Sequence, residues 1–325
     1  MWKTICVSLL TLSAASVSAQ ELRVTFLGTG APRPSFERYG PSILVEAGDQ
    51  RVLVDPSWGL RERIMQVGSF ELLTGIDHVL ISHLHFDHTL GFTDLWLTGW
   101  LFGRRVPLRV QGPVGTTEML GHFRQAYDWD IEYRFLVGVP REGVDIEAQD
   151  VTPGVIYDND GLKITAFEVA HMPIDMETRE LLDFEGQTLG FRFDYHGHSL
   201  VLSCDTRPSD NLIEHARGVD VLVHEAQYAS PGASEEAKLA NVSLSVHTEP
   251  KDAGLVFERA KPKMAVYSHL IPPQVTEEEL KAATPYDGPL IVAHDLMMIT
   301  IGDTIEVSDR PILKDESFEK SKVLK

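Results

Sequence analysis

Four side chains that bind metal ions well lie within a run of six residues. The run contains His83, His85, Asp87 and His88, and it follows an apolar, strand-like stretch that ends at Ser82. Imidazole and carboxylate groups are ligands that suit zinc and similar divalent ions. Histidines that serve packing or solubility do not usually gather so closely, so the run predicts a metal centre rather than a structural cluster.

The stretches that must position these side chains alternate between strand-like and helix-like patterns. Strands are expected at residues 22–27, 42–47, 51–54, 78–82, 108–110, 162–169, 189–195, 199–203, 219–223, 264–268 and 290–293. Helices are expected at residues 59–67, 90–100, 116–126, 211–217, 250–260 and 276–283. The turns Gly48-Asp49 and Gly197-His198 favour hairpins. Hairpins mixed with helices fit two packed sheets with helices outside, which is a single α/β sandwich.

Two segments, 128–150 and 172–188, are expected to be irregular surface loops, and the second is a candidate for shaping specificity. Aromatic side chains near the metal run could line a pocket. The four-residue spacing of Phe92, Trp96 and Trp100 favours packing into the core instead. The pocket alternative would take in Trp58, Phe92, Trp96, Trp100 and Phe102.

The pattern His-x-His-x-Asp-His after an apolar strand resembles the signature of the metallo-β-lactamase superfamily. Other parts of that signature occur in the family's order, namely Asp55, His171, Asp205 and His269, each at the end of a strand-like stretch. The resemblance covers nearly all of the chain after residue 19. It implies the αββα sandwich of the metallo-β-lactamase fold.

The resemblance also implies two divalent metal ions, with zinc expected before manganese or iron. Seven side chains would bind them: His83, His85 and His171 the first ion, Asp87, His88 and His269 the second, with Asp205 as a bridge. Asp55 would orient one of the ligands by a hydrogen bond. Asp87 could also accept a proton during catalysis, and in the family the nucleophile is a metal-bound hydroxide.

Cys204 precedes Asp205, and some lactamases of the superfamily use a cysteine ligand in this region. Neighbouring residues of a strand point to opposite faces, so both side chains are not expected to reach the metals. Asp205 is therefore the predicted ligand, and Cys204 is predicted to be a small buried residue.

The opening segment 26–32 resembles the start of the ribonuclease Z branch of the superfamily. His224-Glu225-Ala226 and His247-Thr248 resemble two later motifs of that branch. By this analogy Glu225 orients His247, which acts as a general acid toward the leaving group. A purely structural Glu225–His247 pair remains the alternative.

The first residues have the marks of a secretory signal peptide: Lys3, an apolar stretch at 5–14, and small residues up to Ala19. The sequence therefore predicts a signal peptide at 1–19, a single domain at 20–325, and a periplasmic or secreted protein. An uncut membrane anchor is the alternative. No later stretch is long enough to span a bilayer, so no membrane contact is expected after cleavage.

The formal net charge is −19, and removal of Lys3 with the signal peptide would make it −20. A strongly acidic surface repels phosphate backbones, so nucleic acid is not expected as a partner. Cys204 would be the one cysteine left, which excludes an internal disulfide. Homodimer formation remains open.

These features predict an exported two-metal hydrolase of small-molecule esters, with an aryl sulfate as the first choice of substrate. The branch contains exported arylsulfatase-like members, whereas tRNA processing by ribonuclease Z fits neither export nor the acidic charge. A phosphodiesterase, a lactonase or a hydrolytic dehalogenase of aromatic compounds would use the same centre. A metal-binding scaffold without catalysis is the non-enzymatic alternative, although all seven candidate ligands are present.

Overall fold

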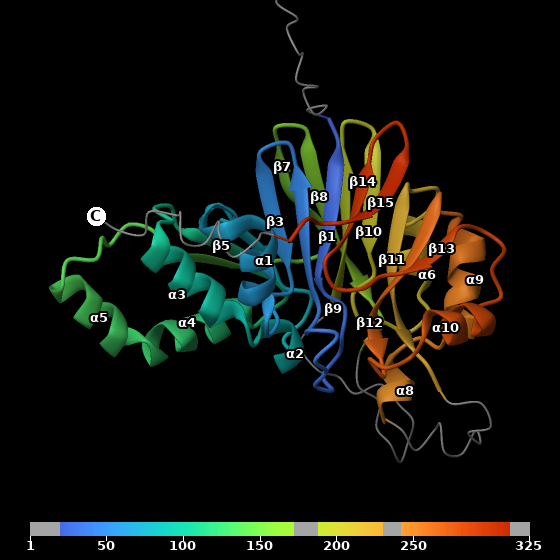
Figure 1. Ribbon diagram of the computed structural model, residues 1–325, viewed down its shortest axis with the longest axis horizontal. Helices are drawn as coiled ribbons and strands as arrows, with labels where there is room; N and C mark the ends of the chain where they lie inside the picture. The colour runs from blue at the N-terminus through green and yellow to red at the C-terminus, as the bar shows by residue number, and fades with distance from the viewer. Residues whose placement is uncertain (1–19, 172–187, 230–241, 313–325) are drawn as a thin grey trace, which may run out of the picture.

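Two β-sheets lie face to face in the computed structural model, with helices on both outer sides (Figure 1). The structure describes residues 20–171, 188–229 and 242–312. The predicted signal peptide, 1–19, and almost all of the predicted loop 172–188 lie outside the described residues. Within the described part of the chain, no helix is long and apolar enough to cross a membrane.

The first sheet has eight strands among the described residues. Their order is β15 (Ile305–Asp309), β14 (Met297–Ile301), β1 (Leu22–Gly28), β2 (Ser42–Ala47), β3 (Gln50–Val54), β4 (His78–Leu80), β5 (Leu108–Gly112) and β6 (Ile146–Asp150). The predicted hairpin around Gly48-Asp49 is confirmed, because β2 pairs antiparallel with β3. Strands β3 to β6 are parallel, so their carboxyl ends meet at one edge of the sheet.

The second sheet has seven strands in the described residues. Their order is β13 (Leu290–Val292), β12 (Met264–Ile271), β11 (Val221–Gln227), β10 (His198–Leu202), β9 (Thr188–Tyr195), β8 (Leu162–Val169) and β7 (Gly154–Asn159). The predicted hairpin around Gly197-His198 is also confirmed, between β9 and β10. Strands β10 to β13 are parallel, so their carboxyl ends share an edge as well.

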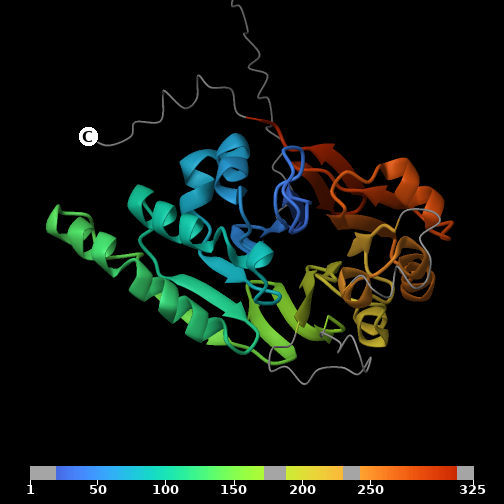
Figure 2. The same ribbon diagram turned by 90° about the horizontal axis from the view of Figure 1, so that it is seen from below.

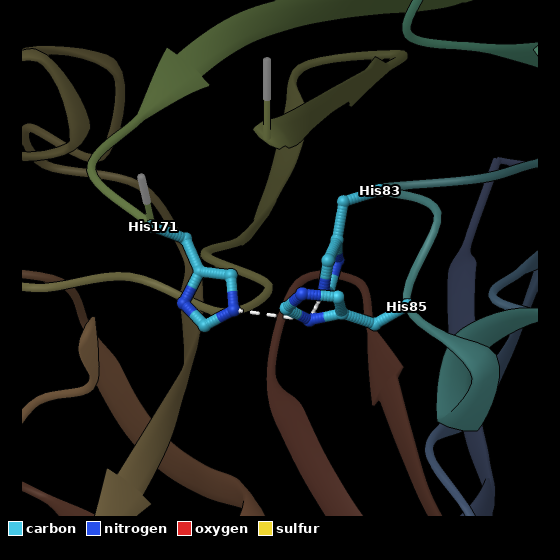
Figure 3. Close-up of side chains that lie close together, drawn as sticks. All are labelled: His83, His85 and His171. Atoms are coloured by element: carbon cyan, nitrogen blue, oxygen red, sulfur yellow. Dashed lines mark hydrogen bonds between the residues drawn. The ribbon is translucent and has the colours of Figure 1, made fainter. Parts of the chain in front are cut away.

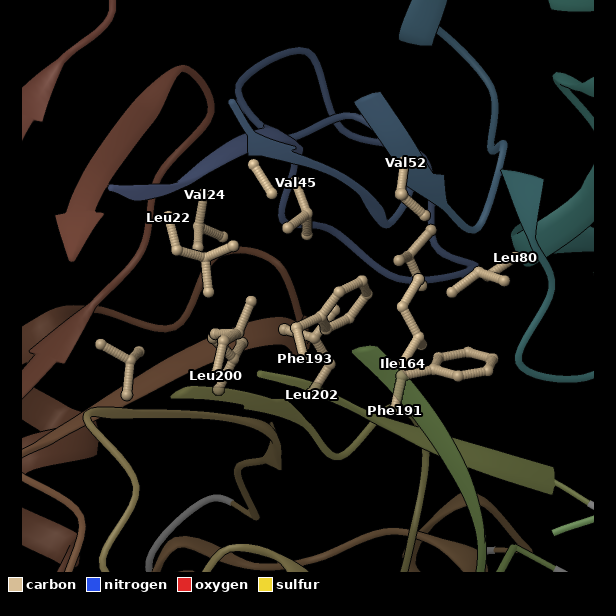
Figure 4. Close-up of a cluster of buried hydrophobic side chains, with 14 of the residues drawn as sticks. Leu22, Val24, Val45, Val52, Leu80, Ile164, Phe191, Phe193, Leu200 and Leu202 are labelled. Atoms are coloured by element: carbon tan, nitrogen blue, oxygen red, sulfur yellow. The ribbon is translucent and has the colours of Figure 1, made fainter. Parts of the chain in front are cut away.

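Apolar side chains from both sheets meet in a central core (Figure 4). Alternate residues of a strand face opposite sides. In β3, Val52 and Val54 enter this core, whereas Leu53 faces the outer helices. Leu200 and Leu202 of β10 enter the same central core from the opposite sheet. Each fully buried side chain of this kind stabilises the fold by roughly 1.5–3 kcal/mol, so the two sheets are held firmly against each other.

Helices cover the outer faces of both sheets (Figure 2). The helices that cover the first sheet are α1 (Leu60–Thr74), α3 (Phe92–Phe102), α4 (Thr116–Ala126) and α5 (Asp128–Leu136). Those on the second sheet are α6 (Asp210–His215), α9 (Pro250–Ala260) and α10 (Glu277–Ala283). The short helices α2 (Phe86–Thr89) and α8 (Val242–Val246) lie at the lower end of the sheets in Figure 1. The predicted αββα sandwich is therefore confirmed.

The prediction of an irregular loop at 128–150 was wrong, because the segment forms α5 and then β6. Its acidic residues do not prevent a helix, since two of them are paired: Asp130 with Arg134 within α5, and Asp128 with Arg124 at the end of the preceding helix α4. Ile131 is fully buried against the first sheet's outer core and anchors the helix.

Candidate metal centre

The run of four predicted ligands lies where β4 ends and α2 begins. His83 follows the end of β4, and His85 precedes the first residue of α2. Asp87 and His88 are both buried in the first turn of α2. The run thus starts at the edge where the carboxyl ends of β3, β4 and β5 meet, and it turns back toward the second sheet.

Three histidine rings form the first group of possible ligands (Figure 3). Nε2 of His83 lies 2.8 Å from Nδ1 of His85, which lies 3.3 Å from Nε2 of His171. His171 follows β8 of the second sheet, so this group joins residues from both sheets. Their nitrogen atoms lie within 4.8 Å of one another, as the ligands of one ion must.

Asp87, His88 and His269 form the second group. Oδ2 of Asp87 lies 3.5 Å from Nε2 of His88 and 3.5 Å from Nε2 of His269. His269 lies in β12 with a positive backbone φ of 48°, a conformation that is uncommon for residues other than glycine. The backbone there departs from the regular strand, since the register with β11 shifts at this point.

Asp205 lies between the two groups. Its Oδ2 atom is 3.8 Å from Nε2 of both His83 and His171, and 3.3 Å from Nε2 of His88. Its Oδ1 atom is 3.3 Å from Nε2 of His269. The carboxylate therefore lies within reach of both groups, the position predicted for a bridging ligand.

The buried donor atoms of this cluster fit a divalent metal ion. No described residue forms a hydrogen bond with Oδ2 of Asp87, Oδ1 of Asp205, or Nε2 of His88 and of His269. Leaving one such atom unpaired costs roughly 1–3 kcal/mol, so four of them facing a common centre indicate a cation. Burial lowers the pKa of His171 to about 4, so its ring is neutral and can offer a lone pair. The assignment of each ligand to one ion stays a prediction.

Asp55 lies where the sequence placed it, behind the ligands. Its Oδ2 atom accepts a hydrogen bond from Nδ1 of His88 at 2.9 Å, and its Oδ1 atom accepts one from the backbone N–H of Ser82 at 2.7 Å. The hydroxyl of Ser82 also donates to Oδ2 of Asp55 at 2.8 Å and lies 3.0 Å from Nδ1 of His83. Ser82 was not singled out from the sequence, where only its place directly before His83 sets it apart.

The predicted pair of Glu225 and His247 is brought together beside the metal cluster. Oε1 of Glu225 lies 3.2 Å from Nδ1 of His247 and accepts a hydrogen bond from the backbone N–H of Thr248 at 2.8 Å. Burial opposes protonation of His247, but the carboxylates of Glu225 and Asp205 together outweigh it and raise the pKa of His247 to about 9. Its ring lies 4.8 Å from that of His171 and 5.7 Å from that of His269.

Cys204 does not join the metal cluster. It is half-buried, packs against the central core and belongs to none of the groups of metal-binding atoms found in the described residues. It lines a cavity of about 30 Å³ behind the cluster, together with Asp55 and Glu225. Burial raises the pKa of its thiol well above the usual value, so the neutral thiol is favoured.

Arg207 is a residue near the centre that the sequence did not single out. Its backbone N–H and its Nε atom both donate to the carbonyl oxygen of Ala170, at 2.9 and 3.1 Å. This places a half-buried guanidinium group next to His171. The one signal in the sequence that could have identified Arg207 is its position two residues after Asp205.

The core alternative for the aromatic residues is confirmed. Phe92, Trp96 and Trp100 are fully buried in the outer core of the first sheet. The indole N–H groups of both tryptophans donate to backbone carbonyls, of Val144 at 2.7 Å and Pro140 at 2.8 Å. These rings therefore hold α3 in place and do not line the metal centre.

An αββα sandwich with clustered histidine and aspartate side chains at one edge defines the metallo-β-lactamase fold. The sequence agrees, because residues 50–270 match the family described as "Beta-lactamase superfamily domain", and the chain belongs to that family. It is also 31% identical over 291 residues to a protein named ribonuclease Z from Mycobacterium sp. (strain KMS), covering 86% of this chain and 96% of the relative. Family membership and the donor set make the chain a metal-dependent hydrolase.

Solved structures of low sequence identity share the fold. Human tRNase Z, short form, matches with a TM-score of 0.64 and 19% identity over 86% of this chain and 99% of that one. The metallo-β-lactamase fold protein YhfI from Bacillus subtilis matches with a TM-score of 0.62 and 18% identity over 89% of this chain and 100% of that one. At this level of identity the two likenesses concern the fold alone.

The relatives correct two predictions made from the sequence. An aryl sulfate or other small-molecule ester as substrate is contradicted, since the similar curated proteins are named ribonuclease Z. The exclusion of nucleic acid is contradicted by the same finding. The net charge of −19 was a poor guide to nucleic-acid binding, because it sums the charges of the whole chain and does not describe the surface around the site. Charges farther than about 8 Å from a bound phosphate are largely screened at physiological salt, so local cations decide the contact.

Proposed function

We propose that this chain is a metal-dependent phosphodiesterase that cleaves RNA, as the name ribonuclease Z implies for its relatives. The observation that carries the proposal is the similarity over 291 residues, 86% of this chain and 96% of the relative. Similarity on this scale includes the strands and loops that supply all seven candidate ligands.

We infer two ions at the centre, with zinc as the natural occupant of such imidazole and carboxylate ligands. His83, His85 and His171 would hold one, Asp87, His88 and His269 the other, with Asp205 in contact with both. When bound, such ions supply Lewis-acid stabilisation of the phosphoryl oxygens and a lowered pKa for water.

The Asp87 carboxylate lies at the centre and is kept ionised by His269 and His88, which outweigh burial and lower its pKa. It is the candidate acceptor for the proton of the attacking water. His247 lies beside His171 and His269 and is protonated at neutral pH, because its pKa is raised to about 9. His247 is therefore the candidate donor of a proton to the departing ribose oxygen, and Glu225 holds it in position.

Arg207 supports an anionic substrate in spite of the acidic net charge. Its guanidinium is fixed at Nε by the carbonyl of Ala170, one residue from His171. No hydrogen bond within the described residues engages its two terminal Nη groups. Paired N–H donors of this kind match the oxygens of a phosphate group.

The decisive experiment is cleavage of a tRNA precursor with a 3′ extension by the zinc-loaded protein. We expect endonucleolytic cleavage that a chelator abolishes and added zinc restores. His269→Ala should lose cleavage, whereas His122→Ala should keep it, because His122 is exposed on α4, away from the ligand groups. Absence of RNA cleavage by the protein with its full metal content would overturn the proposal.

Export remains part of the proposal, resting on Lys3, the apolar stretch and Ala19 in the first residues. Expression of the full chain in a bacterium, cell fractionation and N-terminal sequencing would test it. We expect the protein outside the cytoplasm with Gln20 as its first residue. A cytoplasmic protein that begins at residue 1 or 2 would contradict export without affecting the proposed chemistry.

A further inference from the structure

The candidate metal centre opens to solvent at His85. Six of the seven predicted ligands are buried, and His85 is the exposed one. As far as the structure describes it, the exposed side of the cluster is therefore the side of His85, and the side chains next to His85 border it.

The next residue, Phe86, has 59% of its surface exposed, although it stands between two predicted ligands. The first turn of α2 explains this division: Asp87 and His88 point inward, and Phe86 is left on the outer face. Leu90, four residues later on the same helical face, is 58% exposed. An exposed aromatic ring and an exposed leucine thus form an apolar shelf at the entrance, which we call the Phe86–Leu90 shelf.

Phe86 follows His85, the exposed candidate ligand, directly in the chain, so the shelf borders the exposed side of the candidate centre. A substrate bound at the centre would therefore have its neighbouring groups close to the shelf. In RNA, the apolar face attached closest to a phosphodiester is that of a neighbouring nucleobase. Phenylalanine offers no hydrogen bond, so the contact would be stacking, which every base can make.

We propose that Phe86 stacks on the base of a nucleotide that flanks the scissile phosphate, with Leu90 extending the contact. This rests on the proposed function and deepens it by assigning Phe86 a part in positioning the substrate. A base inside a duplex has both faces covered by its neighbours and could not reach the shelf. Phe86 would then select for single-stranded junctions without reading their sequence.

Two matched RNAs test the proposal: hairpins with a 3′ extension that differ in one flanking nucleotide, which carries a base or is abasic. The zinc-loaded protein should cleave the normal RNA with a KM roughly tenfold lower than the abasic RNA, the order expected for one base stack. Phe86→Ala should raise the KM of the normal RNA to that of the abasic one, and Phe86→Trp should restore the difference. The effect should appear in KM and not in kcat, because the stacked base would contribute equally to binding of the substrate and of the transition state.

Trp129→Ala is the matched control, because Trp129 is 78% exposed and belongs to α5, which lies far from α2 in Figure 1. It should keep the wild-type ratio between the two RNAs. Equal metal content and unfolding temperature of Phe86→Ala and wild type would exclude damage to the neighbouring ligands. If Phe86→Ala still prefers the base-bearing RNA, or wild type has no preference, the stacking role is overturned while the proposed function stands. If wild type cleaves neither RNA, the proposed function fails and this inference fails with it.

Discussion

Oδ2 of Asp55 accepts a hydrogen bond from Nδ1 of His88 at 2.9 Å, and this bond decides which nitrogen of His88 faces the centre. A carboxylate can only accept, so Nδ1 carries a proton and donates it to this bond. The other nitrogen, Nε2, faces the centre at 3.3 Å from Oδ2 of Asp205 and is the atom that would bind an ion. Asp55 is itself held by Ser82, through hydrogen bonds from the backbone N–H and the hydroxyl.

Asp55→Asn should weaken metal binding by about 10- to 100-fold, because the amide cannot fix this tautomer of His88 as the carboxylate does. Chelator competition on the purified protein measures the change. Asp309→Asn, at an exposed side chain of β15, is the control and should bind metal as wild type does. Unchanged metal affinity in Asp55→Asn would show that His88 is oriented without it.

Glu225→Gln should shift the alkaline limb of the pH–kcat profile for RNA downward by about one unit or more. The pKa of His247 is raised to about 9 by Glu225 and Asp205 against the effect of burial, so removal of the Glu225 charge lowers it. His247 acts in its protonated form, and activity is therefore lost as the pH rises through its pKa. Hydrolysis of bis(p-nitrophenyl) phosphate is the internal control, since p-nitrophenolate leaves without a proton. A limb that stays in place would assign the Glu225–His247 pair a structural role.

Arg207→Ala should raise the KM for RNA and reduce the slope of log KM against log salt concentration by about one, as expected when one phosphate contact is lost. The effect should be similar for RNAs of different sequence, since a phosphate contact carries no sequence information. Arg259→Ala removes an exposed arginine paired with Asp210 and serves as the control. An unchanged salt slope in Arg207→Ala would place the guanidinium outside the substrate path.

His78 should make the fold less stable in acid. Burial lowers its pKa to about 4 against a hydrogen bond from the ring to Gln111, so the unfolded chain takes up a proton first as the pH falls. The contribution of neutral His78 to the free energy of unfolding is complete above about pH 6.5, the pKa of the side chain in the unfolded chain. It is lost as the pH falls below that value. Between pH 7 and pH 5, wild type should lose about 2 kcal/mol more unfolding free energy than His78→Gln. Urea unfolding at both pH values measures this difference, and parallel losses would contradict it.

The local part of the site could be predicted from the sequence. His83, His85, Asp87 and His88 form a dense run, His171 and Asp205 follow strands, and His269 lies two residues before the end of β12. Most of the inner strands were also predictable, since an apolar strand packed on both faces leaves a clear pattern. Their parallel order brings those strand ends to one edge.

Three strands at the edges of the sheets, β15, β6 and β7, escaped prediction, and so did the inner strand β14. β15 is exposed over most of its length, and β6 and β7 bury little. An edge strand covered on neither face has no apolar alternation to recognise. The substrate escaped for a different reason, because the total charge carries no information about the position of Arg207 or of the entrance beside His85. Contacts such as those between Arg207 and Ala170 arise only when distant segments meet.

The candidate ligands come from both layers of the sandwich: His83 to His88 follow β4 of one sheet, whereas His171, Asp205 and His269 belong to the other. Each of the two inferred ions would take ligands from both sheets, so its binding would hold the two layers together and its removal would destabilise the whole domain. Occupancy and global stability would then rise together, by about 2.7 kcal/mol at a free metal concentration one hundred times the dissociation constant. Metal supply would thus govern how long the protein survives as well as how fast it works.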